Sequence, residues 1–304
     1  MIVGRFAPSP TGYLHHGSLV AALGSWLCAK KPGGKWLLRI DDLDTPRVIP
    51  GMADDIMGTL EQLGFEWDGV PLWQSRRGEA YADALERLDR NDHLYPCCCS
   101  RADIARIATA PHGEDEIVYP GTCSHGKDPS REARSIRVRV PSEEISFDDV
   151  VTGRVTQRLA DCCGDFVVRR ADDLFAYHLA TVVDDADSLV NQVVRGADLI
   201  TSTGRQIFLQ TLLGYDRPSY VHLPLVIAPC GSKLSKRDSA VSIAAGINLE
   251  LDGGILLTRA LAFLGQDVSA VDQAAPPKEI LSAALLSFDT ELIPKCNSPF
   301  VGAL

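Results

Sequence analysis

The stretch that decides the fold reads Phe6-Ala7-Pro8-Ser9-Pro10-Thr11-Gly12-Tyr13-Leu14-His15-His16-Gly17-Ser18. A short apolar strand over residues 2–7 runs into a turn of Pro and Gly, and from Leu14 onward apolar residues recur at helical spacing. A helix that begins at the carboxyl end of a strand presents free N–H groups and a favourable dipole to phosphate. We therefore expect a phosphate site at His15, Gly17 and Ser18, although an isolated His-x-Gly-Ser more often precedes a plain surface helix.

Alternating strands and helices extend outward from this stretch. A strand at 35–40 and helices at 52–64 and 78–90 indicate a parallel sheet covered by helices. The pattern breaks near Tyr95, where an irregular stretch and short strands indicate an insertion, and it returns near Phe166. Later elements are a helix at 201–213, a strand at 220–227, and helices at 253–264 and 278–287. We expect an α/β fold, with a doubly wound parallel sheet split by a small α+β insertion and followed by a C-terminal helical segment.

The composition is that of an ordinary globular protein. Hydrophobic residues make up 45% and charged residues 23% of the 304 residues. Neither a bilayer-spanning apolar run nor a signal peptide is recognisable, so we expect a cytoplasmic monomer with no membrane partner. The net charge of −10 argues mildly against nucleic-acid binding. Arginines concentrated in the middle of the chain leave open a local basic surface or a solvated face: Arg131, Arg134, Arg137, Arg139, Arg154, Arg158, Arg169 and Arg170.

A second short segment, Lys233-Leu234-Ser235-Lys236-Arg237, follows far downstream. Ammonium groups on a mobile loop can close over a triphosphate and stabilise a departing pyrophosphate. Alone, such a segment is more often a solvated basic turn. Together, the two segments resemble the HIGH-type and KMSKS-type signatures of class I aminoacyl-tRNA synthetases. The resemblance implies a Rossmann-like domain that binds ATP with Mg²⁺ through His15, Gly17, Ser18, Lys233 and Lys236, with His15 and Lys236 as catalytic residues.

Four blocks resemble those of glutamyl-tRNA synthetases: residues 5–12, 38–47, 175–180 and 194–198. The resemblance implies a glutamate pocket formed by Arg5, Ser9, Asp41, Tyr177 and Arg195. Arginines suit this ligand because a guanidinium group binds a carboxylate through two parallel hydrogen bonds. Asp41 departs from the glutamate that is usual in the family, and its shorter side chain implies a looser or water-mediated contact.

Nine cysteines are present, and Cys97-Cys98-Cys99 precedes Tyr119 and Cys123 in the irregular stretch. Zinc favours four ligands, so three cysteines leave one position for His112, His125 or Tyr119. A cluster of buried free thiols explains the spacing equally well. The pattern resembles the zinc-binding insertion of glutamyl-Q tRNA(Asp) synthetases, which implies one Zn²⁺ per chain held by Cys97, Cys99, Tyr119 and Cys123.

These resemblances imply a division into three regions. Residues 1–92 and 166–232 form the Rossmann-like catalytic domain, residues 93–165 form an inserted zinc-binding, acceptor-type subdomain, and residues 233–304 form the lysine loop and C-terminal helices. Only 67 residues follow Arg237, too few for the anticodon-binding region of a glutamyl-tRNA synthetase. The chain thus looks like the truncated glutamyl-Q tRNA(Asp) synthetases.

That resemblance implies activation of L-glutamate by ATP and its transfer to queuosine at the wobble position of tRNA(Asp). The alternatives are a glutamyl-tRNA synthetase core that charges tRNA(Glu), a non-catalytic tRNA-binding paralogue, and a small-molecule adenylyl transferase with the same fold.

Overall fold

The first strand, β1 (Val3–Phe6), leads through the Pro- and Gly-rich turn into the long helix α1 (His16–Lys30). The computed structural model describes residues 1–107, 118–227, 243, 248–295 and 298–299. Strand β2 (Lys35–Ile40) pairs in parallel with β1, and β3 (Leu72–Trp73) pairs in parallel with β2. Helix α1 is apolar and buried on nearly all sides from Leu19 to Ala29, because it lies between the sheet and the C-terminal helices.

The other half of the parallel sheet lies on the opposite side of β1. Strand β9 (Gln192–Gly196) pairs in parallel with β10 (Ser219–Leu223), and β10 pairs in parallel with β6 (Glu144–Asp149). Strand β7 (Gly153–Arg158) forms an antiparallel hairpin with β6. Asn191 joins the halves, because its N–H donates to the Val3 carbonyl over 3.0 Å and its side-chain oxygen accepts from the Val3 N–H over 2.8 Å. The strand order therefore reverses between β1 and β9, which is where ligands bind in doubly wound sheets.

A separate small sheet holds the cysteine-rich region. Strands β4 (Leu94–Cys97), β5 (Ser135–Val138) and β8 (Phe166–Arg169) pair antiparallel, beside the short helices α4 (Arg101–Ile107) and α5 (Leu159–Cys162). The strand pairing crosses the expected region boundaries, because β6 joins the large sheet through β10 whereas β8 joins the small sheet through β5. Sequence patterns of such short strands do not reveal which sheet receives them.

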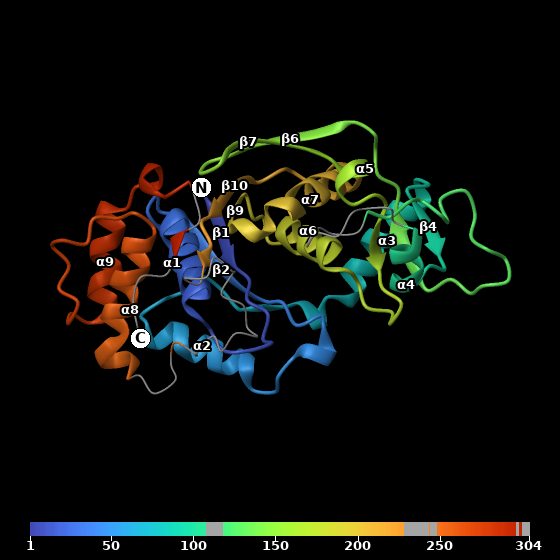
Figure 1. Cartoon of the computed structure of the whole chain (residues 1–304). Coiled ribbons are helices and arrows are strands. Elements are labelled where there is room, and N and C mark those ends of the chain that lie inside the picture. The colour runs from blue at the N-terminus through green and yellow to red at the C-terminus, as the bar shows by residue number, and fades with distance from the viewer. Residues whose placement is uncertain (108–117, 228–242, 244–247, 296–297, 300–304) are drawn as a thin grey trace.

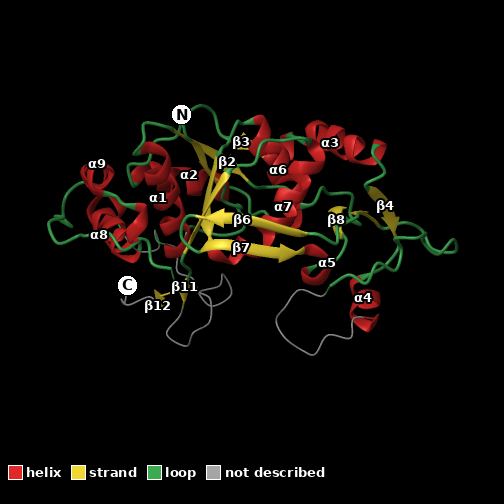
Figure 2. Cartoon of the chain, turned by 90° about the horizontal axis from the view of Figure 1, so that it is seen from above, coloured by secondary structure: helices red, strands yellow, loops and turns green. Residues whose placement is uncertain are grey.

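Helices cover the large sheet and extend it at one end. They are α2 (Met52–Gln62), α3 (Gly78–Arg90), α6 (Tyr177–Asp187), α7 (Ile200–Leu213), α8 (Leu249–Phe263) and α9 (Pro277–Ser287). Short 3-10 helices are η1 (Thr45–Arg47), η2 (Gln74–Arg76), η3 (Ala197–Leu199) and η4 (Thr290–Leu292), and β11 (Val226–Ile227) pairs with β12 (Ser298–Pro299). Figures 1 and 2 show α8 and α9 beside α1 at one end of the molecule and β4 and α4 at the other.

The main core lies between α1, the sheet and the C-terminal helices. Trp36 is fully buried, stacks on Phe6 and packs at a tilt against Phe65. Its indole N–H donates to the Ser25 hydroxyl over 2.9 Å, which satisfies the buried polar group. The predicted α/β fold with a parallel sheet and C-terminal helices is confirmed. Within the described residues, no helix combines the length and apolarity needed to cross a membrane.

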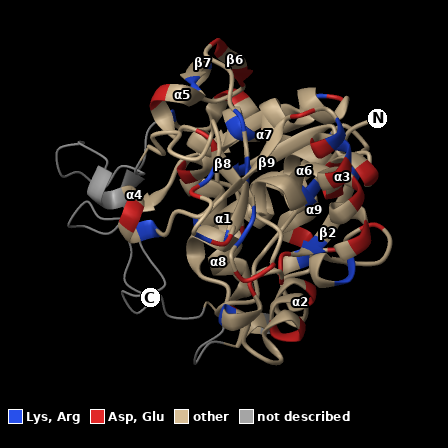
Figure 3. Ribbon diagram, turned by 90° about the vertical axis from the view of Figure 1, so that its right-hand side faces the viewer, with Lys and Arg blue, Asp and Glu red and all other residues tan. Residues whose placement is uncertain are grey.

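Charged residues of both signs are interspersed along the ribbon (Figure 3). Five of the mid-chain arginines form ion pairs: Arg131 with Asp103, Arg154 with Asp148, Arg158 with Glu144, Arg169 with Asp173, and Arg170 with Asp172. Carboxylate partners cancel much of the positive field that these arginines would otherwise offer to phosphates. For these five, the structure favours the solvated face over a concentrated basic surface.

Candidate functional site

A cavity of about 240 Å³ opens where the strand order reverses. The turn after β1 and the start of α1 form one wall, and the carboxyl ends of β9 and β10 form the other. The structure brings four of the predicted site residues to its lining: Ser9, His15, Gly17 and Ser18. Its opposite wall contains Gly196, Asp198 and residues 223–226. The predicted lysines Lys233 and Lys236 lie outside the described residues.

His15 caps helix α1 and faces this cavity. Its ring Nδ1 accepts a hydrogen bond from the Ser18 N–H over 3.2 Å. A neutral ring whose Nδ1 accepts carries its proton on Nε2, which makes Nε2 a donor. A Cβ at Gly17 would lie 3.1 Å from the His15 ring, so a larger residue there would displace that ring by a few tenths of an ångström. Residues 16–19 include no acidic side chain, so the positive end of the helix dipole is left for an anionic ligand.

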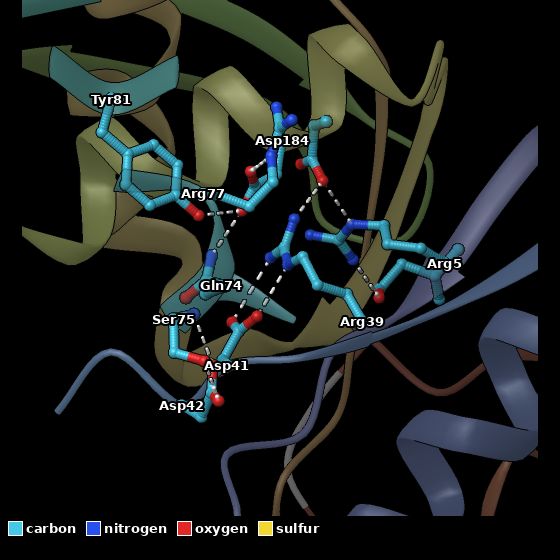
Figure 4. A network of polar contacts seen from close by, with 11 residues as sticks. Arg5, Arg39, Asp41, Asp42, Gln74, Ser75, Arg77, Tyr81 and Asp184 are labelled. Carbon is cyan, nitrogen blue, oxygen red and sulfur yellow. Dashed lines mark hydrogen bonds and ion pairs between the residues drawn. The ribbon is translucent and has the colours of Figure 1, made fainter. Parts of the chain in front are cut away.

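A buried ion-pair network adjoins the cavity (Figure 4). Arg5 Nε lies 3.2 Å and Arg39 Nη1 lies 2.6 Å from the same carboxylate oxygen of Asp185. Arg39 also holds Asp41, with Nε 2.6 Å from one carboxylate oxygen and Nη2 3.3 Å from the other. Burial alone would raise the pKa of Asp185, but Arg5 and Arg39 together lower it below its ordinary value. The network therefore fixes Arg5 at the end of β1.

The neighbouring carboxylate on α6, Asp184, is fully buried and held by three donors. Gln74 Nε2 lies 2.7 Å from it, the Tyr81 hydroxyl 2.8 Å, and Arg77 Nε 3.2 Å. Burial raises the pKa of Asp184, although these hydrogen bonds and Arg39 oppose the shift. Together, Asp184 and Asp185 anchor α6, the helix that begins at Tyr177.

Arg195, on β9, is 5% exposed and is held by neutral groups. Its Nη1 donates to Gln206 Oε1 over 2.7 Å, its Nη2 to Thr203 Oγ1 over 2.8 Å, and its Nε to His222 Nε2 over 3.2 Å. Among the described residues, no carboxylate lies within ion-pair distance of this guanidinium group. A buried cation without a paired anion is costly, so the arrangement favours a negatively charged ligand at Arg195.

A carboxylate behind His222 sets the orientation of Arg195. Asp149 Oδ2 lies 2.7 Å from His222 Nδ1 and also accepts the His222 backbone N–H over 3.0 Å. Burial lowers the pKa of His222, although Asp149 opposes the shift. A neutral ring that donates from Nδ1 to Asp149 presents the Nε2 lone pair to Arg195. Burial also lowers the pKa of Arg195, with Arg5 acting in the same direction and Tyr177 opposing.

The residues predicted to bind the glutamate substrate thus lie at different positions relative to the cavity. Ser9 lines the cavity, Arg5 and Arg195 each immediately precede a cavity-lining residue, and Tyr177 begins α6 with 37% of its surface exposed. Asp41 directs both carboxylate oxygens to Arg39, and its side chain is only 7% exposed. Both carboxylate oxygens of the short Asp41 side chain are therefore bound by Arg39.

The cysteine cluster has the dimensions of a tetrahedral metal site. Sulfur atoms of Cys97, Cys99 and Cys123 all lie within 4.8 Å of one another, and Cys99 Sγ is 3.6 Å from Cys123 Sγ. The Tyr119 hydroxyl oxygen lies 3.4 Å from Cys97 Sγ and 3.8 Å from Cys99 Sγ. In a tetrahedral zinc site with zinc–sulfur distances of roughly 2.3 Å, neighbouring sulfurs lie about 3.8 Å apart. The donor set fits zinc.

The other ligands that the sequence suggested for this site are His112 and His125. His125 is exposed and does not belong to the group of close metal-ligating atoms among the described residues, and His112 lies outside them. Cys98 Sγ approaches Cys123 Sγ to 3.7 Å without joining that group. Away from the cluster, Cys163 is buried whereas the neighbouring Cys162 is exposed.

Sequence reasoning missed the residues that hold the site together. Arg39, on β2, stands two positions before Asp41, which follows the strand, so the two side chains can share one face, and this period-2 relation was a usable signal. Asp184 and Asp185 directly follow Val182 and Val183 in α6 and are buried with them, and buried acids need partners. No sequence signal paired Asp149 with His222, because they are 73 positions apart on strands joined only by the fold.

Comparison with known proteins places this geometry in a family. The model of the catalytic domain of class I tRNA synthetases (E and Q) matches residues 1–298. Glutamyl-Q tRNA(Asp) synthetase of Geobacter sulfurreducens is 57% identical over 300 residues, which cover 98% of this chain and 96% of that protein. The corresponding protein of Dechloromonas aromatica is 54% identical over 265 residues, covering 87% and 86%. The crystal structure of glutamate-tRNA synthetase from Elizabethkingia anophelis superposes with a TM-score of 0.79 at 25% identity, covering 98% of this chain and 68% of that chain.

Proposed function

The chain belongs to the class I tRNA synthetases for glutamate and glutamine, and within them to the glutamyl-Q tRNA(Asp) synthetases, and on this premise we propose how its residues perform the reaction. The protein is a ligase that activates L-glutamate with ATP and transfers it to queuosine of tRNA(Asp). The observation that carries the mechanism is the adjacency of a helix N-terminus in an open cavity and the buried guanidinium group of Arg195, which has no carboxylate partner in the part of the chain that the structure describes.

ATP binds with its phosphates at the N-terminus of α1. Gly17 offers its backbone N–H group there, Ser18 offers its side-chain hydroxyl because its N–H already caps the helix through His15 Nδ1, and His15 Nε2 donates to a phosphoryl oxygen. The glutamate α-carboxylate attacks the α-phosphorus in line, the bond to the bridging oxygen breaks, and pyrophosphate leaves. His15 stabilises the negative charge that develops on the phosphoryl group, and Lys233 and Lys236 stabilise the departing pyrophosphate. Mg²⁺ accompanies ATP and neutralises part of its charge.

Glutamate binds beside the triphosphate. Arg195 and Arg5 receive carboxylate groups, with Ser9 and the Tyr177 hydroxyl completing the polar lining. Asp41 acts chiefly by fixing Arg39, which in turn fixes Asp185 and Arg5. This explains how aspartate can serve at a position where direct contact with the substrate ammonium would demand a longer side chain. In the second step a queuosine hydroxyl attacks the mixed anhydride, an ester forms and AMP leaves.

Transfer should be specific for queuosine-bearing tRNA(Asp). We expect glutamate-dependent ATP–pyrophosphate exchange without tRNA, and radiolabelled glutamate in tRNA(Asp) that carries queuosine but not in the same tRNA lacking it. Glutamylation of tRNA(Glu) would instead support 3′-end charging. Absence of exchange with any amino acid would support a non-catalytic binding module.

The cysteine cluster holds one Zn²⁺ through Cys97, Cys99, Tyr119 and Cys123, which organises the small sheet for tRNA. Metal analysis of the purified chain should return about one zinc per chain. Cys123→Ser should lower this content strongly, whereas Cys28→Ser, at another buried cysteine, should leave it unchanged. A wild-type protein without zinc after purification in zinc-containing medium would identify the cluster as buried free thiols.

A further inference from the structure

A buried arginine lies against the cysteine cluster, although the sequence placed it among mid-chain arginines of a basic surface or a solvated face. Arg137, on β5, is 7% exposed, and its Nε–H donates to Cys97 Sγ over 3.3 Å. Its guanidinium carbon lies 3.7 Å from the centre of the Tyr119 ring. One guanidinium group therefore touches two of the four proposed ligands at once.

The other contact of Arg137 does not neutralise its charge. Nη1 donates to the backbone carbonyl of Asp165 over 2.6 Å, and no carboxylate among the described residues lies within ion-pair distance. A buried cation needs a counter-charge. Three thiolates and a phenolate around Zn²⁺ carry a net negative charge, which supplies that counter-charge at hydrogen-bond distance. In return, the guanidinium group reduces the repulsion among the anionic ligands.

We infer that Arg137 is the charge-compensating and positioning residue of the zinc site. It fixes the direction of Cys97 Sγ through a charge-assisted hydrogen bond and clamps the Tyr119 ring by stacking on its face. A tyrosine ligand is thereby held in place by a residue that does not touch the metal. This inference rests on the proposed zinc site. Outer-shell partners of this kind typically change metal affinity by about 10- to 100-fold.

The test is zinc affinity, measured by competition with a chromophoric chelator on the full chain. Arg137→Gln should weaken zinc binding by about 10- to 100-fold, and Arg137→Lys should recover part of the loss by restoring the charge without the planar fork. The matched control is Arg139→Gln. Arg139 stacks on Tyr95 at 4.7 Å and donates to the Ser124 carbonyl over 2.7 Å, so the same charge is removed without touching a ligand.

Substitution of Co²⁺ gives a second readout that does not depend on activity. The visible spectrum should keep its thiolate-to-cobalt bands in Arg137→Gln, because the ligands remain, while the Co²⁺ affinity falls with that for Zn²⁺. Wild-type affinity in Arg137→Gln, or an equal loss in Arg139→Gln, would overturn the role of Arg137. A wild-type chain that binds neither metal would instead refute the zinc site itself. Circular dichroism of each metal-free variant identifies any that fail to fold, and Arg137→Lys then carries the comparison.

Discussion

Arg195→Ala is expected to raise the KM for glutamate in ATP–pyrophosphate exchange by roughly 30-fold to several thousand-fold. The range follows from the cost of about 2–5 kcal/mol for truncating one member of a buried, hydrogen-bonded charge pair. The KM for ATP should change little, because Arg195 lies beside the amino-acid part of the proposed site. The loss of glutamate binding should be large because Gln206, Thr203 and His222 hold the guanidinium group in position to bind a carboxylate.

Two further variants sharpen this result. Arg195→Lys keeps the charge but loses the fork geometry, so its KM for glutamate should remain well above that of the wild type. Arg90→Ala is the charge-matched control, since Arg90 is exposed on α3 and pairs with Glu86 there. An unchanged KM for glutamate in Arg195→Ala, in a folded protein, would refute the proposed carboxylate site.

His15→Asn is expected to lower kcat for exchange by about 10²- to 10³-fold, the usual cost of removing one preorganised donor from a transition state. Asparagine is an effective helix cap, so it should preserve the bond to the Ser18 N–H and the thermal stability. His15→Ala should lower kcat similarly and also destabilise the fold by about 0.5–2 kcal/mol, because α1 loses its cap.

Comparing the two His15 variants separates catalysis from folding. Exchange kinetics give kcat, and thermal unfolding gives stability. If His15→Asn exchanged pyrophosphate at the wild-type rate, His15 would be a capping residue alone. If both variants lost activity only in proportion to the fraction unfolded, the catalytic assignment would fail in the same way.

Local sequence patterns predicted most of the fold. The turn before α1 and the helix itself could be predicted because a strand, then Pro and Gly, then apolar residues at helical spacing form a local sequence pattern. The sequence did not reveal which strands would pair with one another. Strand β6 joins β10, and β8 joins β5, through contacts between distant residues that period-2 patterns do not encode.

The site shows the same division. The sequence could propose His15, Gly17 and Ser18 together because they share one turn, and Cys97, Cys99 and Cys123 because thiols are rare and clustered; the structure brings each set together. The supporting groups could not be found in this way. Asp149 reaches His222, and Asp185 reaches Arg5 and Arg39, only after the sheet halves meet. Ion pairs and hydrogen bonds between charged residues far apart in the sequence cannot be predicted from the local sequence around either residue.

The most direct test is a structure of the chain bound to a non-hydrolysable glutamyl-adenylate analogue, glutamyl-sulfamoyl-adenosine. The account predicts the sulfamoyl group at the N-terminus of α1, within hydrogen-bond distance of His15, and a glutamate carboxylate on Arg195. An analogue bound with its glutamyl group away from Arg5 and Arg195, or outside the cavity between β1 and β9, would contradict it.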